Sequence, residues 1–485
     1  MARIIGREEE LKILETIYHS NKAEFLAIYG RRRIGKTFLI SEHFKDKGLY
    51  FEITGIKKAS LSEQLRNFAV EMSEVFYQGK QLKTPKSWQE AFTIFRREIN
   101  KITTSKKIIL FFDELPWLAS PRSNFLNALD YLWNCYLSRN SKVILIVCGS
   151  AASWVIKKII NSRGGFYGRV TRTIRLLPFN LAETERYLKS KNIQLDRKQI
   201  IDIYMALGGV PKYLSYLEKG KSATQNINDL CFSSQGQLYR EFNKLYNSLF
   251  DGAERHIAII RALAKRPFGL MQDELAKTVR LKTGGTFSDI IQELIESGFI
   301  AYIPAFSKKE KLGHYKLIDE YSLFYIIWVE SASKSILNQV DKNYWIKQQN
   351  ARVWSIWSGF AFESLCLKHI DNIKRALGIS GVSTVESGWR YKAISEDEEG
   401  AQIDLVISRA DNCVNLCEIK YLNKEFSINK QYAKELVRKK QIFIKQTETK
   451  KTPFVTLITT YGVKENANYL GVVDNQLLMD DFYET

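Results

Sequence analysis

Short, mostly apolar runs recur through the first third of the chain and alternate with stretches of helical periodicity, such as 87–101. Runs of this length are typical of strands buried on both faces of a sheet. The five runs are Phe25–Tyr29, Leu49–Ile53, Ile108–Phe112, Val143–Val147 and Thr173–Leu177. Strands that alternate with helices predict an α/β fold, a doubly wound parallel sheet that binds its ligand at the carboxyl ends of the strands.

A phosphate-binding loop follows the first run. The string Gly30-Arg31-Arg32-Arg33-Ile34-Gly35-Lys36-Thr37 fits the pattern G-x-x-x-x-G-K-[ST] and leads into the amphipathic stretch 37–44. Such a loop points backbone N–H groups at phosphates, at the N-terminus of a helix. We expect Lys36 to reach the β- and γ-phosphates and Thr37 to bind Mg²⁺. The alternative is a glycine-rich turn that only precedes a helix.

Two acids follow the third run directly. Hydrolysis of a nucleotide needs a carboxylate near Mg²⁺ and a group that orients the attacking water. We expect Asp113 to bind the metal and Glu114 to orient the water. Ser150 follows the fourth run as either a γ-phosphate sensor or a helix N-cap, and we favour the N-cap.

Three further motifs resemble the AAA+ and STAND-type NTPases, and in particular their archaeal ATPase branch. They are the motif Gly6-Arg7-Glu8, the pair Gly168-Arg169, and the sequence Gly208-Gly209-Val210-Pro211. The resemblance implies ATP as ligand, an ATPase core at residues 1–179 and a helical lid at 180–250. It places Gly6 and Arg7 near the adenine and makes Arg169 an arginine finger or sensor, although a plain surface arginine fits equally well. The expected nucleotide-binding residues are Gly6, Arg7, Gly30, Arg31, Arg32, Arg33, Ile34, Gly35, Lys36, Thr37, Phe38, Arg169 and Pro211.

Residues 251–330 predict three helices, at 254–265, 271–280 and 288–297, followed by a β-hairpin. This order resembles a winged helix-turn-helix. The third helix carries Asp289, Glu293 and Glu296 but no lysine or arginine, so DNA phosphates would repel it. We therefore favour a packing or protein-contact role for this helix. The aromatic stripe 321–329 is expected to be core.

Residues 345–485 predict an α/β domain with a carboxylate cluster. Runs 403–407 and 414–420 predict an antiparallel hairpin, which would bring Asp404 toward Glu418 and Lys420. Two carboxylates can hold a divalent metal, here a second one besides Mg²⁺, and a lysine can position water or stabilise a phosphoryl group. The pattern resembles the PD-(D/E)xK nucleases, with Glu363 matching their helix-borne acid. The alternative is a salt-bridged strand face without activity.

Composition limits the remaining choices. A chain of 485 residues implies three or four domains, and a net charge of +19 favours polyanions such as DNA, although a solvated basic surface is equally consistent. Six scattered cysteines and no apolar membrane span predict a cytoplasmic protein without membrane contact. We expect an ATPase coupled to a nuclease-like domain that binds or cuts nucleic acid. The alternative is an ATP-dependent switch that binds a protein partner, and a homo-oligomer is compatible with both.

Overall fold

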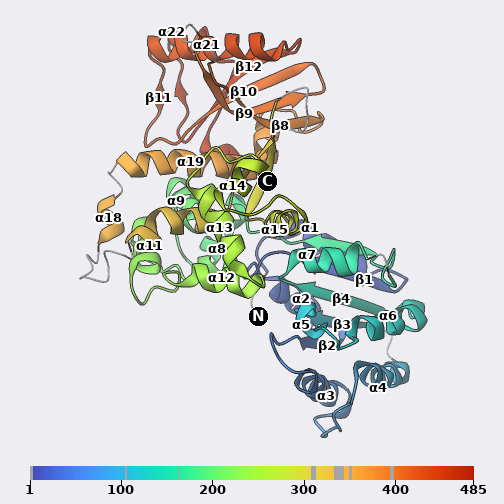
Figure 1. Cartoon of the computed structure of the whole chain (residues 1–485). Helices are drawn as coiled ribbons and strands as arrows, with labels where there is room; N and C mark the ends of the chain where they lie inside the picture. The colour runs from blue at the N-terminus through green and yellow to red at the C-terminus, as the bar shows by residue number, and fades with distance from the viewer. Residues whose placement is uncertain are drawn as a thin grey trace. The chain divides into compact units, whose positions relative to one another are not determined.

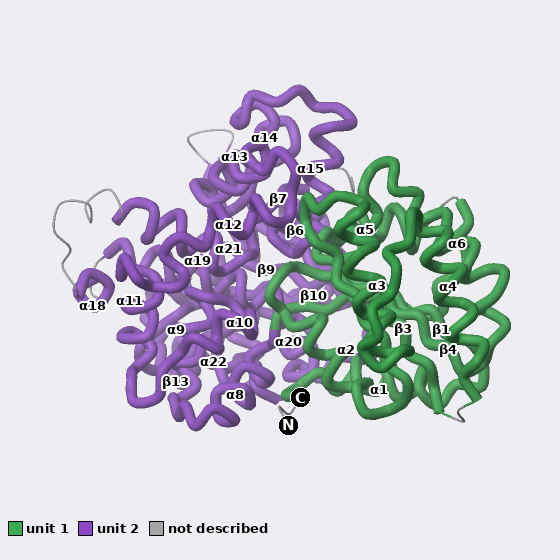
Figure 2. Tube along the Cα trace, turned by 90° about the horizontal axis from the view of Figure 1, so that it is seen from below, with its two compact units in different colours: residues 1–178 green, residues 179–485 purple. Residues whose placement is uncertain are grey.

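A computed structural model describes residues 4–103, 106–162, 164–306, 313–332, 343–348, 352–393 and 398–484. The chain divides into two units, Met1–Pro178 and Phe179–Thr485, which Figure 2 shows in green and purple. The predicted ATPase core corresponds to the first unit, and the regions predicted as lid, winged helix and nuclease-like domain all fall in the second. The four-domain division itself stays a prediction.

The first unit is built on a five-stranded sheet in the order β2-β3-β4-β1-β5, and every neighbouring pair is parallel. The strands are β1 (Glu24–Tyr29), β2 (Gly48–Thr54), β3 (Lys107–Asp113), β4 (Val143–Gly149) and β5 (Arg172–Arg175). Each of the five apolar runs forms one of these strands. The predicted α/β fold with a parallel central sheet is confirmed.

Helices cover both faces of this sheet because successive strand residues point to opposite sides. Leu26 and Ile28 pack with α1 and α2, whereas Phe25 and Ala27 pack with α3, α4 and α6 (Figure 1). The helices of this unit are α1 (Glu8–Tyr18), α2 (Lys36–Phe44), α3 (Leu61–Tyr77), α4 (Trp88–Lys101), α5 (Leu115–Leu118), α6 (Phe125–Cys135) and α7 (Ala152–Val155), with single turns at Leu137–Arg139 and Ile156–Ile160. No helix among the described residues is long and apolar enough to cross a membrane.

The second unit begins with a helical region and continues into the predicted three helices and hairpin. Its helices up to this point are α8 (Leu181–Ser190), α9 (Arg197–Leu207), α10 (Pro211–Leu214), α11 (Ala223–Phe232), α12 (Glu241–Leu249), α13 (Ala253–Ala264), α14 (Gln272–Thr278) and α15 (Gly285–Glu296). Strands β6 (Ile300–Pro304) and β7 (Gly313–Leu317) form an antiparallel hairpin. The elements match the expected order, and their assignment to a winged helix stays a prediction.

An aromatic core joins the middle of this unit to the helices that follow. They are α16 (Glu320–Phe324), the turn Tyr325–Val329, α18 (Tyr344–Gln348), α19 (Arg352–Lys368) and α20 (Ile370–Ala376). Phe324 and Trp328 pack on Trp345 and Trp357 with ring centroids 4.9–6.2 Å apart. The prediction that stripe 321–329 is core is therefore confirmed.

A second five-stranded sheet, in the order β14-β12-β10-β9-β8, forms the C-terminal part. Its strands are β8 (Thr384–Tyr391), β9 (Ala401–Arg409), β10 (Cys413–Lys420), β12 (Thr452–Thr459) and β14 (Asn475–Leu477), and the remaining elements are β11 (Phe426–Ser427), α21 (Lys430–Thr447), β13 (Val463–Lys464), α22 (Ala467–Leu470) and the turn Met479–Tyr483. Strands β9 and β10 pair antiparallel, as predicted for the hairpin. Helix α19 covers one face, against Leu405 and Ile419, and α21 covers the other, against Val406 and Leu416 (Figure 1).

Phe51 lies at the centre of the aromatic core of the first unit and contacts four other phenylalanine rings. Phe51→Ala should lower the free energy of unfolding by about 3–5 kcal/mol, because truncation leaves a cavity that the close-packed rings cannot fill. Denaturant unfolding measures this loss, taken from the unfolding transition that ATP shifts to higher denaturant. Val70→Ala, at a position 52% exposed, should cost far less. Equal losses would show that the ring cluster does not hold this unit together.

Candidate functional site

The phosphate-binding loop connects β1 to α2 in the first unit. Gly30 has a φ of 146°, and a Cβ there would lie 2.2 Å from the carbonyl oxygen of Leu176, so glycine is required. Gly35, also at positive φ, immediately precedes α2. The loop backbone therefore wraps around the N-terminus of a helix, where N–H groups and the helix dipole favour phosphate.

Lys36 is buried inside the loop. Its Nζ donates hydrogen bonds to the carbonyl oxygens of Gly30 and Arg31, both at 2.9 Å, and to Ser150 Oγ at 3.1 Å. These bonds hold the ammonium group on the inside of the loop, where a phosphate chain would lie.

The carboxyl end of β3 meets the start of α2. Thr37 Oγ1 donates a 2.6 Å hydrogen bond to Asp113 Oδ2, although 76 positions separate the two residues. A hydroxyl and a carboxylate oxygen are ligands that Mg²⁺ prefers, and a magnesium ion commonly keeps several waters besides one or two carboxylates. The chemistry of this pair fits the metal expected from the sequence.

Ser150 connects Lys36 to Glu114. Its Oγ donates to Glu114 Oε1 at 2.5 Å, and its backbone N–H donates to Glu114 Oε2 at 3.2 Å. The favoured prediction that Ser150 caps a helix is wrong, because Ala151 precedes α7 and Ser150 provides no capping bond. Its side chain instead fixes the carboxylate expected to orient water.

The N-terminal motif contacts the phosphate loop directly. Arg7 is buried, and its Nη2 donates to the carbonyl oxygen of Ile34 at 3.4 Å, while Nη1 pairs with Glu10 at 3.6 Å. Arg31 and Ile34 of the loop are buried as well, whereas Phe38 is 45% exposed. The Arg32 guanidinium lies 6.0 Å from the Trp117 ring centroid.

Two predicted nucleotide-binding residues lie elsewhere. Arg169 is exposed in the turn before β5, and its charge acts on Asp130, where it opposes the rise in pKa that burial causes. Pro211 begins α10 in the second unit. Nucleotide contact by either residue stays a prediction.

The predicted acids of the C-terminal sheet lie on the face that α21 covers. Leu405 pairs with Cys417, so continuing the register puts Asp404 opposite Glu418. Asp404 Oδ2 accepts a 2.9 Å hydrogen bond from the backbone N–H of Ile419. Alternate residues of a strand point to the same face, so Lys420 lies on the same face as Glu418. Its Nζ lies 4.5 Å from the ring centroid of Tyr432 on α21.

Glu418 is the most constrained of these groups. Its side chain is buried, Oε2 accepts a 2.7 Å hydrogen bond from Lys439 Nζ, and Oε1 has no hydrogen-bond partner in the described part of the chain. Burial and the nearby charge of Asp404 raise the pKa of Glu418 to about 7, against the opposing effect of Lys439. Sequence reasoning missed Lys439, since the basic run 438–440 on α21 reads as a solvated face.

Glu363 takes a different partner. Its Oε2 lies 3.1 Å from Lys316 Nζ on β7, and burial raises its pKa to about 7, with Lys316 opposing and Asp404 adding to the rise. Across the described residues, no three His, Cys, Asp or Glu side chains gather closely enough to hold a metal ion. A metal here would therefore be held by the pair Asp404 and Glu418, with the orphaned Glu418 Oε1 available to it.

Comparison with known proteins agrees with the geometry of the first unit. Residues 4–217 match the model of a family described as an ATPase domain predominantly from Archaea. The chain contains an archaeal-type ATPase domain. The match supports ATP binding and hydrolysis by this domain, and it extends past the first unit into α8–α10.

Relatives cover both the ATPase domain and the rest of the chain. An uncharacterized protein of Methanocaldococcus jannaschii is 24% identical over 448 residues, which is 90% of this chain and 92% of that protein. An uncharacterized ATP-binding protein of the same organism is 42% identical over 57 residues, which is 12% of this chain and 85% of that protein. A Walker-type ATPase of Pyrococcus abyssi aligns with 67% of this chain and 96% of its own at 18% identity and a TM-score of 0.48.

Ser150→Ala in the ATPase domain should lower ATP turnover by about 10²-fold, the scale of loss from a misplaced catalytic group, while ATP affinity changes little. The reason is that Glu114 loses both a donor and its link to Lys36. Steady-state hydrolysis and nucleotide titration measure the two effects. Ser153→Ala is the matched control, since that buried hydroxyl has no hydrogen-bond partner within the described ranges. Full turnover in Ser150→Ala would exclude a positioning role.

Proposed function

We propose that this protein is a Mg²⁺-dependent ATPase whose nucleotide state controls a nuclease-like metal site in the second unit. The observation that carries the nuclease part is the buried Glu418 carboxylate, one oxygen of which has no hydrogen-bond partner among the described residues. An unpaired buried oxygen on a charged group is costly, so its presence favours a ligand that completes the site. The proposed domains are a lid at 180–250, a winged helix at 251–330 and a nuclease-like domain at 345–485.

At the ATPase site, Lys36 would bind the β- and γ-phosphates, and Thr37 and Asp113 would hold Mg²⁺. When bound, Mg²⁺ neutralises charge on the phosphate oxygens. Glu114 would accept a hydrogen bond from the attacking water and orient it toward the γ-phosphate. Ser150 keeps the Glu114 carboxylate in place, and Arg7 supports the loop from behind through Ile34.

At the nuclease-like site, Asp404 and Glu418 would hold a divalent metal, which polarises a phosphoryl oxygen when bound. Lys420 lies on the same strand face and would stabilise negative charge on the scissile phosphate. Lys439 would then pass from Glu418 to the phosphate or to a water. Glu363 acts at most through its charge, because its carboxylate is paired with Lys316.

A second candidate is an ATP-dependent switch that binds a protein partner. It is favoured by the lysine partners of the buried acids, Lys439 and Lys316, which would also satisfy a site without catalysis. Helix α15 agrees with a packing role, since Glu293 pairs with His256 at 2.8 Å. Six free cysteines fit a reducing compartment for either candidate.

Glu114→Gln should retain ATP and lower turnover by about 10²–10³-fold, the loss typical of removing one electrostatic partner of a transition state. The amide keeps the shape of the side chain but cannot orient water as a carboxylate does. Rapid filtration of bound nucleotide and steady-state hydrolysis are the measurements, with Lys36→Ala as the variant that should lose binding instead. Hydrolysis at the wild-type rate would remove Glu114 from this role.

Asp404→Asn and Glu418→Gln should each reduce Mg²⁺- or Mn²⁺-dependent DNA cleavage by at least about 10²-fold and leave ATP hydrolysis unchanged. The assay is cleavage of single-stranded, duplex and branched DNA with and without ATP. Glu386→Gln provides the control, since Glu386 lies in the same sheet and pairs with Lys374 at 2.6 Å. Wild-type protein that cuts none of these DNAs with either metal would favour the switch.

A further inference from the structure

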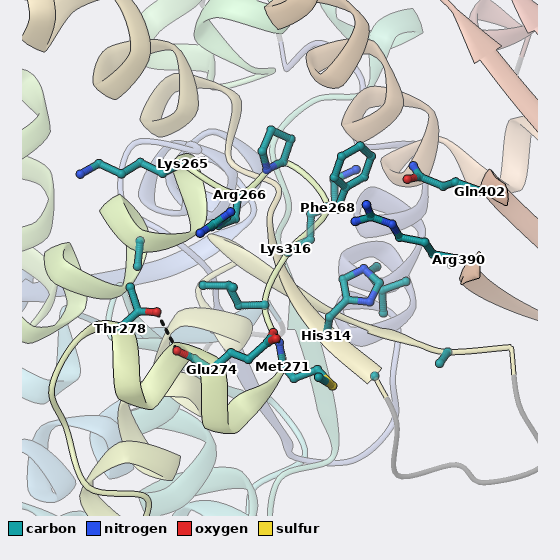
Figure 3. A pocket seen from close by; sticks show the side chains of 18 of the residues that line it. Lys265, Arg266, Phe268, Met271, Glu274, Thr278, His314, Lys316, Arg390 and Gln402 are labelled. Carbon is teal, nitrogen blue, oxygen red and sulfur yellow. Dashed lines mark hydrogen bonds between the residues drawn. The ribbon is translucent and has the colours of Figure 1, made fainter. Parts of the chain in front are cut away.

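The second unit contains a cavity of 1530 Å³ that the nuclease-like proposal leaves unused (Figure 3). Its walls come from the end of α13, the loop to α14, helix α14, strands β6 and β7, helix α19, and strands β8 and β9 of the C-terminal sheet. Asp404 and Glu363 lie in the same lining. The cavity thus runs from the helical middle region to the acids of the sheet.

Backbone hydrogen bonds fix the walls. Leu270 and Tyr315 exchange N–H···O bonds of 3.0 and 2.8 Å, which fasten the α13–α14 loop to β7. Gly269 makes this approach feasible, because its φ is 86° and a Cβ would lie 2.4 Å from the Tyr315 oxygen. On the other side, Phe306 N–H donates to the Gly388 carbonyl at 3.1 Å and ties the hairpin region to β8. Backbone hydrogen bonds thus hold both sides of the cavity in place.

Its lining is strongly cationic. Two basic residues of the lining are neutralised locally, Arg261 by Glu330 and Lys316 by Glu363. Six others are exposed and have no carboxylate at salt-bridge distance in the part of the chain that the structure describes: Lys265, Arg266, Lys277, Arg280, Arg390 and Lys392. Uncompensated cations that face one another across a cavity repel, and a polyanion relieves that repulsion.

An aromatic ring stands among these cations. Phe268 is 40% exposed, and the Arg390 guanidinium lies 5.4 Å from its ring centroid (Figure 3). Phe360 supports the ring edge-on with centroids 5.4 Å apart. A supported, exposed ring beside guanidinium groups is the arrangement on which unpaired bases stack in single-strand binding sites.

We propose that this cavity binds a single strand of nucleic acid, with backbone phosphates on Lys265, Arg266 and their cationic neighbours and a base stacked on Phe268. The volume exceeds the roughly 300–1,000 Å³ of ordinary small-molecule pockets and suits several nucleotides. A duplex keeps its bases stacked inside and could not use the ring. Delivery of a phosphodiester to Asp404 rests on the nuclease-like function proposed above, whereas binding does not.

The test is fluorescence anisotropy of labelled oligothymidylate with the full chain in EDTA, so that no cleavage enters. Lys265→Glu/Arg266→Glu should weaken binding at least about tenfold more than Lys219→Glu/Lys244→Glu, which changes the net charge equally at exposed sites outside the cavity. In Lys265→Glu/Arg266→Glu, the magnitude of the negative slope of log affinity against log salt should decrease by about 1.4. The reason is that each lost phosphate contact on a single strand contributes about 0.7 to that slope.

Phe268→Ala should weaken binding about tenfold at every salt concentration and leave the slope unchanged, since stacking releases no counterion. Phe268→Tyr should retain affinity. The proposal would be overturned if the two double variants weakened binding equally, or if the wild type did not bind single strands. It would also be overturned if the protein preferred duplex DNA and Phe268→Ala did not change its affinity. Binding with these signatures in a protein that never cleaves DNA would uphold this site and reject the nuclease function.

Discussion

A carboxylate removed from water must gain a cation, a hydrogen-bond donor or a metal, and this constraint organises both units. In the ATPase domain, Glu114 follows directly on the buried strand β3 and is held by two donors from Ser150. In the C-terminal sheet, Glu418 is buried within β10, and among the residues that the structure describes it is held through one oxygen, by Lys439. A buried charge paired this incompletely adds little to stability, so a ligand is the better physical explanation for it.

The same constraint explains where the charged groups gather. In the parallel sheet, Asp113 reaches Thr37 because the carboxyl end of β3 and the start of α2 meet at one edge. In the second sheet, antiparallel pairing of β9 with β10 sets Asp404 opposite Glu418, and the charge of Asp404 raises the pKa of Glu418. The lysines of α21 and β7 then offset part of that cost. The cationic cavity continues this arrangement outward, since it brings uncompensated positive charge up to the acids.

Local sequence was sufficient to predict the strands of the first unit, the phosphate loop and the β9–β10 hairpin. The signals for these elements are apolar runs, glycine spacing and turn residues, and each of them lies within a short segment of the chain. Local sequence was insufficient for Ser150, whose partners lie 114 and 36 positions away. Lys439 and Lys316 were missed for the same reason: their roles arise when α21 and β7 pack beside acids of distant segments. Glu363 shows the converse, since a motif position alone did not reveal its pairing with Lys316.

The central claim is that Glu418 and Lys439 are kept for a metal ligand and not for stability. The most direct measurement is denaturant unfolding of the second unit in the full chain, with and without Mn²⁺, for wild type and for Glu418→Met/Lys439→Met. We predict that the double variant without metal is as stable as wild type or more so, by up to about 1–4 kcal/mol. Mn²⁺ should raise the unfolding midpoint of the wild type only, because binding to the folded state alone stabilises it. The account would be contradicted if Mn²⁺ did not change the unfolding midpoint of the wild type and the double variant lost several kcal/mol of unfolding free energy.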